Sequence, residues 1–340
     1  MSRYASAHEN TKGPGDARPT ALQIVEDEGL VGQLTDKVFL VTGVSGGIGV
    51  ETMRALYATG GHVFGTVRNL EKGRKVVEDI KAKTQGGEMT LIEMDLESLD
   101  SIRKGAEAFL KQSSHLSVLI CNAGVMATPE GKTKDGFETQ FGTDHLSHFY
   151  LFQLLKDTLL KSTTPDFPSR VVSVSSIGHR VGEIRFDDYN FAQPGSYDPW
   201  LSYGQAKTAN IYFANEIERR YGGQGLHATS LHPGGIITNL QQHIDPALAA
   251  AWDSPEVTLY MKSPEQGAAT SVYAALSKEW AGKGGRYLSN CVEMEAWAAK
   301  DRSNPVGLEH DGYQTWAYDE AKEKRLWRDS LKMVGLEAEQ

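Results

Sequence analysis

Apolar residues gather in short runs that alternate, from Lys37 onwards, with segments of helical periodicity. Strands buried on both faces of a sheet give near-continuous apolar runs, and their alternation with helices indicates successive βα units. The runs are VFLVTG (38–43), HVFGTV (62–67), MTLIEMD (89–95), SVLICNAG (117–124), RVVSVSS (170–176), LHATSLHPGG (226–235) and GRYLSN (285–290). The pattern predicts one α/β domain over 37–335, a Rossmann-type doubly wound parallel sheet of about seven strands with helices on both faces.

Three segments depart from this alternation. Residues 1–20 are polar and rich in Gly and Pro, and they predict a disordered tail because they offer too little apolar surface to offset their ordering entropy. Residues 21–36 predict an extension with a short helix ending near Gly29 or Gly32. Residues 236–262 predict a lid over a hydrophobic substrate. Its apolar residues are Ile237, Leu240, Ile244, Leu248, Trp252, Leu259 and Met261.

Composition and charge narrow the possible partners. A formal net charge of −9 argues against binding to nucleic acid or anionic lipid, both of which require clustered Lys and Arg. Two cysteines, Cys121 and Cys291, cannot build a disulfide framework, and the histidines lack metal-ligand spacing, so we expect no metal. No apolar stretch approaches the ~20 residues of a membrane span, and the N-terminus lacks an apolar signal region. We therefore expect a cytoplasmic protein.

A glycine-rich turn, Thr42 to Gly49, joins the first strand to the first helix. Backbone N–H groups and the helix dipole make an anion site at such a junction. Gly43, Gly47 and Gly49 would supply the turn, the close approach to a pyrophosphate and the tight packing of the helix. The turn alone is also compatible with an ordinary strand-to-helix connection, but a second strand ends about 20 residues further on, as a dinucleotide site requires.

The end of that second strand bears on the choice between NAD and NADP. An NAD site places Asp or Glu there to bind the ribose 2′-hydroxyl, but the sequence has Thr66-Val67-Arg68-Asn69. A guanidinium at Arg68 can hold a 2′-phosphate through a charge-assisted contact. An arginine that only faces solvent is the alternative. The sequence favours NADP(H) as the cofactor.

Tyr203 and Lys207 are four residues apart, on one face of an expected helix. A phenol with a pKa near ~10 is a poor acid or base at neutral pH. The Lys207 ammonium and an oxidised nicotinamide would both favour the phenolate and lower that pKa. An exposed helical pair is the alternative, and it becomes a poor explanation once Asn122-Ala123-Gly124 and Ser175-Ser176 end two further strands.

The order TGxxxGIG, NAG, VSS, YxxxK and HPGG resembles the short-chain dehydrogenase/reductase family from about Lys37 to Val334. It is similar to the retinol-dehydrogenase-like branch and to fungal reductases, which implies a possible place in secondary metabolism. The resemblance implies that Tyr203 is the general acid/base, Lys207 its partner and Ser176 the residue that holds the substrate oxygen. The residues expected to bind the cofactor are Gly43, Ser45, Gly47, Ile48, Gly49, Arg68, Lys72, Asp95, Leu96, Asn122, Ala123, Gly124, Tyr203, Lys207, Pro233, Gly234, Ile236 and Thr238.

Asp144, the fourth expected catalytic residue, departs from the family pattern. The family has an asparagine there, which bends its helix and holds through its backbone carbonyl a water linking Lys207 to solvent. A carboxylate near Lys207 would stabilise the ammonium and weaken its effect on the Tyr203 pKa. A tolerated substitution with an intact relay stays open.

Three hypotheses of function follow from these residues. In the first, NADPH delivers hydride to a carbonyl of a moderately hydrophobic ketone, or NADP⁺ accepts it from the secondary alcohol, while Tyr203 moves the proton. The second is a non-redox step such as cyclisation, dehydration or isomerisation, and the third is a dinucleotide-binding module without turnover. The resemblance also implies a homodimer or homotetramer through the helices from about 137 and 203, which a C-terminal helix or the N-terminal extension could block.

Overall fold

An eight-stranded sheet forms the centre of the computed structural model, which describes residues 2–297 and 311–337. The strand order is β3-β2-β1-β4-β5-β6-β7-β8, and every neighbouring pair is parallel except β7 and β8. The strands are β1 (Val38–Thr42), β2 (His62–Val67), β3 (Glu88–Glu93), β4 (Val118–Cys121), β5 (Ser169–Val174), β6 (Leu226–His232), β7 (Arg286–Ser289) and β8 (Val292–Glu293). The predicted α/β sheet is confirmed, with the short β8 added at one edge.

The chain changes direction across the sheet beside β1. Leu40 of β1 is in register with Phe64 of β2 on one side and with Leu119 of β4 on the other. A crevice opens at the carboxyl ends of the strands at such a point, and ligands of doubly wound sheets bind there. The glycine-rich turn and the Asn122-Ala123-Gly124 segment follow directly on β1 and β4, so the topology brings both to this crevice.

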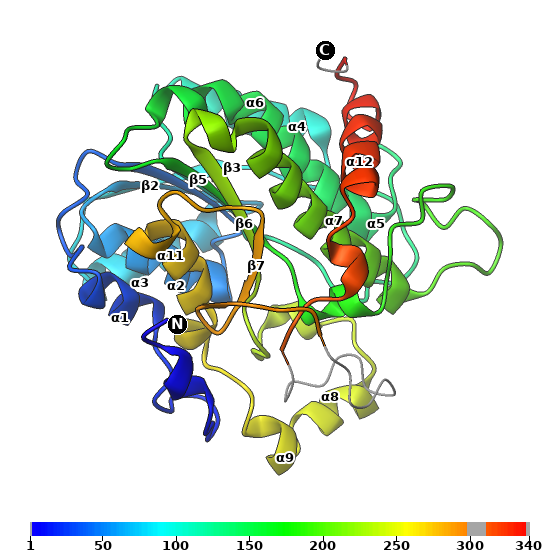
Figure 1. The fold of residues 1–340 in the computed structure, drawn as a ribbon, viewed down its shortest axis with the longest axis horizontal. Coiled ribbons are helices and arrows are strands. Elements are labelled where there is room, and N and C mark those ends of the chain that lie inside the picture. The colour runs from blue at the N-terminus through cyan, green and yellow to red at the C-terminus, as the bar shows by residue number, and fades with distance from the viewer. Residues whose placement is uncertain (1, 298–310, 338–340) are drawn as a thin grey trace.

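Helices cover both faces of the sheet (Figure 1). One face carries α2 (Ile48–Ala58), α3 (Leu70–Lys83) and α11 (Ala269–Leu276), with α1 (Ala21–Asp27) packed on α2 and α11. The other carries α4 (Leu99–Leu110), α6 (Ser147–Ser162) and α7 (Pro199–Tyr221). Each layer buries its own apolar cluster against the sheet, which holds the strand ends that carry the site in fixed positions.

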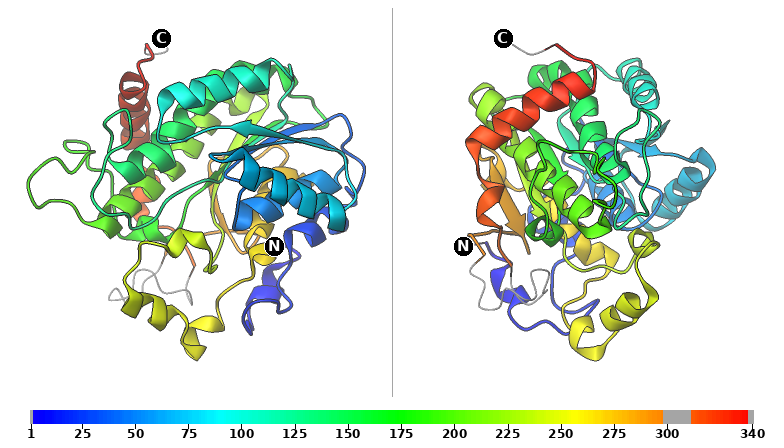
Figure 2. Two further views of the ribbon diagram at one scale, coloured as in Figure 1. Left: turned by 180° about the vertical axis from the view of Figure 1, so that it is seen from behind. Right: turned by 90° about the vertical axis from the view of Figure 1, so that its right-hand side faces the viewer.

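The C-terminal helix α12 (Glu320–Met333) lies over α6 and α7, as Figure 2 shows. Trp327 is 2% exposed, and its ring meets Phe149 edge-on at 4.9 Å. Glu323 accepts a 2.7 Å hydrogen bond from Asn215 of α7 and forms an ion pair with Arg219. An apolar face shared by α6 and α7 is thereby closed within the chain.

Short elements connect these layers. The lid region 236–262 contains η5 (Asn239–Gln241), α8 (Pro246–Trp252) and α9 (Pro255–Thr258), and α10 (Pro264–Gly267) follows it. Each of α8, α9 and α10 begins at a proline after an Asp or Ser whose side chain caps it. The remaining elements are η1 (Ala5–His8), α5 (Thr139–Phe141), the π-helical turn η2 (Gly142–Leu146), η3 (Ile177–Arg180), η4 (Gly222–Gln224), η6 (Lys278–Trp280) and η7 (Thr315–Ala317).

The N-terminal segment differs from the expected disordered tail, because residues 2–20 are ordered against the domain. Tyr4 is 5% exposed, packs edge-on against Tyr273 of α11 and donates a hydrogen bond to Asp27. Arg18 is buried, and its guanidinium binds backbone carbonyls near residue 260. The segment gains long-range hydrogen bonds that its composition does not reveal. The short helix expected within residues 21–36 is α1. Met1 of the expected tail and 298–310 of the expected domain lie outside the described residues.

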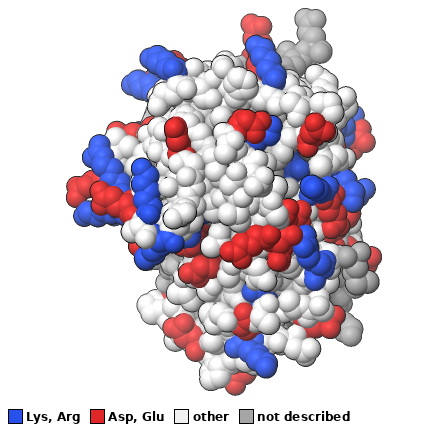
Figure 3. Space-filling model, turned by 90° about the vertical axis from the view of Figure 1, so that its left-hand side faces the viewer, with Lys and Arg blue, Asp and Glu red and all other residues white. Residues whose placement is uncertain are grey.

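The face drawn in Figure 3 shows basic and acidic side chains side by side, without a continuous basic area on that face. Within residues 2–297 and 311–337, no helix has the length and apolar character to cross a bilayer. The same residues contain no cluster of three or more His, Cys, Asp or Glu side chains able to hold a metal ion.

Candidate active site

The glycine-rich turn can adopt its shape only with glycine at key positions. Gly43 and Gly47 have φ of +74° and +60°, which disfavours a side chain at either position. A Cβ at Gly49 would lie 2.3 Å from the carbonyl oxygen of Gly43 and 2.6 Å from the Asn122 amide nitrogen. Ser45 and Gly46 are exposed and Ile48 begins α2, so exposed backbone of the turn, with its N–H donors, lies at a helix N-terminus. This donor set fits a dinucleotide pyrophosphate.

The end of β4 holds the turn in place. The Asn122 side chain donates hydrogen bonds to the carbonyls of Thr42, at 2.8 Å, and Gly43, at 3.4 Å. Its Oδ1 is buried without a hydrogen-bond partner among the described residues, which leaves an acceptor beside the crevice. The Ala123 methyl lies against Gly43, where a Cβ would come within 2.7 Å of it. Asn122 and Ala123 therefore shape the expected cofactor site as well as line it.

The expected adenosine end of the site lies after β2 and β3. The Arg68 side chain is 67% exposed, and its nearest acid is Glu97, with Nη1 and Oε1 3.4 Å apart. Lys72 is exposed in the first turn of α3, and Leu96 is buried. Asp95 accepts hydrogen bonds from Glu97 N at 3.1 Å and from the Lys134 ammonium at 2.7 Å. An adenine amino group would therefore compete with Lys134, which is exposed and free to move aside.

The segment after β6 brings the other end of the expected cofactor site to the same crevice. Gly234 has a φ of +114°, and the Pro233 carbonyl accepts a 3.1 Å hydrogen bond from Lys262. The Thr238 methyl lies over Gly47, 3.4 Å from where a Cβ would stand, so the start of the lid touches the glycine-rich turn. Ile236 is buried between them and α10. The structure thus brings the two expected cofactor segments together.

Helix α7 places Tyr203 and Lys207 side by side. Both are 4% exposed, and the Lys207 ammonium lies 5.4 Å from the centre of the Tyr203 ring. The ring packs against Gly178, where a Cβ would come within 2.6 Å of Cε1. Gly178 is therefore required for the phenol to reach its position, a role that the sequence analysis missed.

Ser176 and Ser175 have different environments at the end of β5. The Ser175 hydroxyl is buried and donates a 2.7 Å hydrogen bond to the Lys207 carbonyl, which fixes α7 to the sheet. The Ser176 hydroxyl accepts a 3.0 Å hydrogen bond from Gly178 N and interacts with the Tyr203 hydroxyl. Of the two serines, Ser176 is thus the one whose hydroxyl lies beside Tyr203.

Asp144 lies in the π-helical turn η2 and binds Lys207 directly. Its Oδ2 is 2.8 Å from the Lys207 ammonium, and its Oδ1 accepts a 2.8 Å hydrogen bond from Val125 N. Asp144 is 0% exposed. A Cβ at Gly124 would lie 3.2 Å from both Asp144 Oδ2 and Lys207 Nζ, so glycine at this position leaves room for the pair.

The backbone carbonyl of Asp144 is already engaged. It accepts a 2.9 Å hydrogen bond from His148 Nδ1, and His148 Nε2 lies 2.9 Å from the Thr42 hydroxyl. That hydroxyl accepts the N–H groups of Asn122 and Ala123, so its own proton is directed to His148 Nε2. Burial lowers the pKa of His148 to about 4, which keeps the ring neutral. The carbonyl that the resemblance assigned to a water contact thus binds His148, a histidine that the sequence analysis considered only as a metal ligand.

The protonation of Tyr203 is set by burial and by its charged neighbours. Burial raises the Tyr203 pKa; Lys207 and the Ser176 hydrogen bond lower it, and Asp144 raises it again. The net shift is upward, so the lowering expected from Lys207 is outweighed. Burial lowers the Lys207 pKa, but Asp144 and Tyr203 raise it by more, so the ammonium stays charged. Burial also raises the pKa of Asp144, against the opposite effects of Lys207 and Val125 N–H.

An apolar wall stands beside Tyr203. Met126 and Ala127 pack against it together with Trp200, Leu240, Ile244 and Trp252. The Trp200 ring meets Tyr203 at 6.2 Å and Trp252 at 6.4 Å, both edge-on. Met126 and Ala127 were missed, although their position directly after Asn122-Ala123-Gly124 could have indicated them. Of the other apolar lid residues, Met261 is buried, Leu248 is half-buried, and Ile237 and Leu259 are exposed.

Comparison with known proteins agrees with this geometry. The family described as short chain dehydrogenase matches residues 37–249. A short-chain dehydrogenase/reductase of Penicillium roqueforti, prx1, is 50% identical over 338 residues, 98% of this chain and 95% of its own. Retinol dehydrogenase 12 of Mus musculus is 36% identical over 90% of this chain and 89% of its own. A solved structure of an uncharacterized Mycobacterium paratuberculosis protein, 31% identical, matches with a TM-score of 0.66 over 90% of this chain and 96% of that one. The chain belongs to the short-chain dehydrogenase/reductase family of oxidoreductases.

Proposed function

We propose that this oxidoreductase uses NADPH to interconvert a carbonyl and an alcohol on a moderately hydrophobic small molecule. The observation that carries the proposal is the placement of buried Tyr203 and Lys207 with half-buried Ser176 beside an apolar wall. Protonated Tyr203 suits a general acid that gives its proton to a carbonyl oxygen held by Ser176. When bound, the reduced nicotinamide supplies the hydride that goes to the carbonyl carbon, and the charged Lys207 stabilises the phenolate left behind.

Support for NADP over NAD comes from the charges at the end of β2. Among the described residues, the carboxylate partner of the Arg68 guanidinium is Glu97 at 3.4 Å, and such a long, exposed contact can give way to a phosphate. Lys72, in the first turn of α3, adds a second cation. A ribose 2′-phosphate fits this pair better than a bare hydroxyl, and the position that binds a hydroxyl in NAD enzymes lacks a carboxylate.

Support for an apolar substrate comes from the wall formed by Met126, Trp200 and Trp252. Aromatic and aliphatic lining with a few polar groups at one end favours a ketone or secondary alcohol over a sugar phosphate. A relative with 36% identity is named for retinol, and the Penicillium relatives make a place in fungal secondary metabolism part of the proposal.

The test follows the absorbance of NADPH with a panel of aromatic and aliphatic ketones, and of NADP⁺ with the matching alcohols. Tyr203→Phe should lower kcat about 1,000-fold while NADPH still binds, because only the proton donor is lost. Arg68→Ala should weaken NADPH binding about tenfold or more and leave NADH binding unchanged.

Three outcomes would contradict the proposal in different ways. Equal binding of NADPH and NADH to wild type and to Arg68→Ala would remove the cofactor assignment. Product formation without cofactor oxidation would favour a non-redox step such as cyclisation, dehydration or isomerisation. Binding of the dinucleotide without turnover of any substrate would favour a silent binding module.

A further inference from the structure

The N-terminal segment 2–20 touches the lid where the lid returns to the domain, at residues 258–263. Gly13 N donates a 3.0 Å hydrogen bond to the Leu259 carbonyl. Gly13 has a φ of +98°, and a Cβ there would lie 3.1 Å from the Thr258 carbonyl oxygen. The segment therefore approaches the lid backbone as closely as a neighbouring strand would.

Arg18 makes the strongest contact between the two segments. Its side chain is 2% exposed and forms a 2.8 Å ion pair with Asp16. The guanidinium donates to the carbonyl oxygens of Tyr260, at 2.9 Å, and of Met261, and also to Gly13. The hydrogen bond to the Met261 carbonyl is buried, and a buried carbonyl left without a donor is costly, so the position of residues 260 and 261 depends on Arg18.

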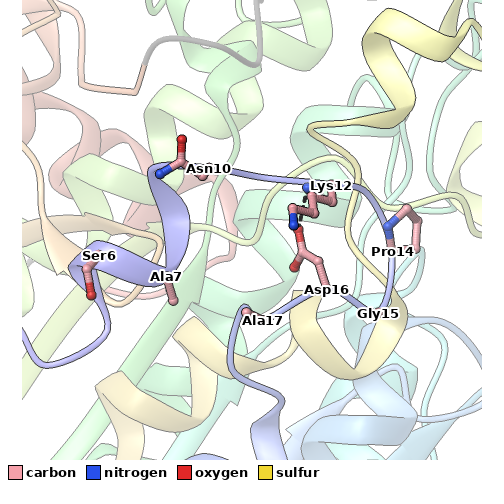
Figure 4. Close-up of a pocket in the computed structure, with 8 residues that line it drawn as sticks. All are labelled: Ser6, Ala7, Asn10, Lys12, Pro14, Gly15, Asp16 and Ala17. Carbon is pink, nitrogen blue, oxygen red and sulfur yellow. Dashed lines mark hydrogen bonds between the residues drawn. The ribbon is translucent and has the colours of Figure 1, made fainter.

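Gln266 of α10 also binds the N-terminal segment, at residues 15–18. Its Oε1 accepts hydrogen bonds from Gly15 N at 2.9 Å and from Ser263 N at 3.1 Å. Its amide nitrogen donates to the carbonyl of Arg18 at 3.1 Å and to Asp16. A hollow of about 470 Å³ lies within the segment, lined by residues 6–17 (Figure 4), and contains none of the expected catalytic residues. Figure 4 also shows the Lys12–Asp16 contact that shapes this turn, in which Lys12 N donates to Asp16 at 2.8 Å.

Lys262 carries the connection on to the cofactor end of the site. Its backbone N–H donates a 2.8 Å hydrogen bond to the Gly235 carbonyl, and its ammonium donates to the Pro233 carbonyl at 3.1 Å. The Lys262 stem lies against Gly234, where a Cβ would come within 2.7 Å of it. Lys262 directly follows Tyr260 and Met261, whose carbonyls Arg18 binds, and it contacts the turn 233–235.

We propose that Arg18 is a positioning residue of this site: by holding the carbonyls of Tyr260 and Met261 it fixes Lys262, and through Lys262 the turn at Pro233 and the closed lid. The inference rests on the proposed function, in which that turn and the lid meet the nicotinamide and the substrate. Without Arg18 the lid would remain attached through the chain, but residues 258–263 would also sample positions away from the N-terminal segment.

The test compares Arg18→Ala and Arg18→Lys with Arg3→Ala as the matched control. Arg3 lies in the same segment, but its side chain is 53% exposed, and its contacts are with Asp27, Glu28 and the Tyr4 ring. Arg18→Ala should raise KM for the carbonyl substrate and Kd for NADPH about tenfold with a smaller change in kcat. Hydrogen exchange at residues 258–263 and 233–238 should quicken. Arg18→Lys should restore part of the loss, because an ammonium can reach one carbonyl, and Arg3→Ala should match wild type.

Unchanged KM, Kd and exchange in folded Arg18→Ala would overturn the proposal, as would a fall in kcat alone with a lower melting temperature. Should Arg18→Ala not fold, Gln266→Ala breaks the same junction from the other side and should show the same rise in KM and in exchange; wild-type values in that variant would overturn the proposal equally. Hydrogen exchange needs no turnover, so it tests the junction even if the wild type neither binds NADPH nor reduces a ketone, an outcome that would contradict the proposed function instead.

Discussion

The floor of the site and the lid above it are built in different ways. The floor comprises Ser176, Tyr203, Lys207 and Asp144, of which all but the half-buried Ser176 are at most 4% exposed, on a strand end, a π-helical turn and a helix of 23 residues. The lid consists of helical pieces of three, seven and four residues that have no fully buried side chain. Packing and paired charges fix the floor, whereas caps and the Arg18 junction hold the lid. The proposed reacting groups thus have one geometry, and the lid that is proposed to meet the substrate has few restraints.

Acid should act on the buried domain that supports the floor far more than on the lid. Burial lowers the pKa of His145 and His179 to about 3, that of His148 to about 4 and that of His232 well below its ordinary value. Unfolded histidine takes up a proton below pH ~6.5, so the stability from keeping these rings neutral is present above that pH and lost as the pH falls below it. Near pH 5 each ring should cost about 2 kcal/mol.

Urea unfolding between pH 7.5 and pH 5 measures this loss. His145→Gln should flatten the dependence, whereas His243→Gln, at an exposed position of the lid, should leave it unchanged. A free energy of unfolding that stays constant over this range would contradict the difference drawn between floor and lid.

A change in the lid should alter substrate binding without altering stability. Trp252→Ala removes an aromatic side chain from the wall beside Tyr203, and KM for an apolar ketone should rise about 30-fold, since burying such a side chain is worth about 2 kcal/mol. The melting temperature should move little, because Trp252 lies outside the two main cores.

Leu110→Ala, an exposed apolar residue of α4, serves as the control and should leave KM as it is. Should Trp252→Ala lower the melting temperature strongly while KM stays the same, the lid would be a structural element of the core and the comparison would fail.

The smallest of these effects concerns the charge of the floor. In wild type the pair of Lys207 and Asp144 is neutral beside Tyr203; Asp144→Asn leaves a net positive charge, from which a proton departs more easily. The alkaline rise in the rate of alcohol oxidation should therefore shift to lower pH, by about one unit.

The pH–rate profile of kcat/KM measures this shift, with Glu130→Gln as a control at an exposed carboxylate. Superimposable profiles of wild type and Asp144→Asn would deny the carboxylate any part in setting the Tyr203 pKa, and the backbone contact with His148 would then be the only role left for residue 144.

The parts of the molecule that depend on local pattern could be predicted from the sequence. The apolar runs gave seven strands near their observed positions because a strand buried on both faces must be apolar throughout. The glycine-rich turn could be predicted because a close approach of backbone allows only glycine. The Tyr203–Lys207 pair could be predicted because residues four apart share one face of a helix.

What could not be predicted depends on contacts between distant residues. Arg18 is buried only because carbonyls some 240 residues later meet it. The role of His148 depends on its contact with Thr42, which lies more than 100 residues earlier in the chain and on another element. The net shift of the Tyr203 pKa required its burial, which the spacing to Lys207 does not reveal.

The packing of α12 on α6 and α7 bears on how the protein responds to dilution. The apolar face shared by α6 and α7 is covered by Trp327, which belongs to the same polypeptide. An intramolecular partner has an effective concentration that does not fall when the protein is diluted. We therefore expect Trp327 to keep this face covered at any protein concentration.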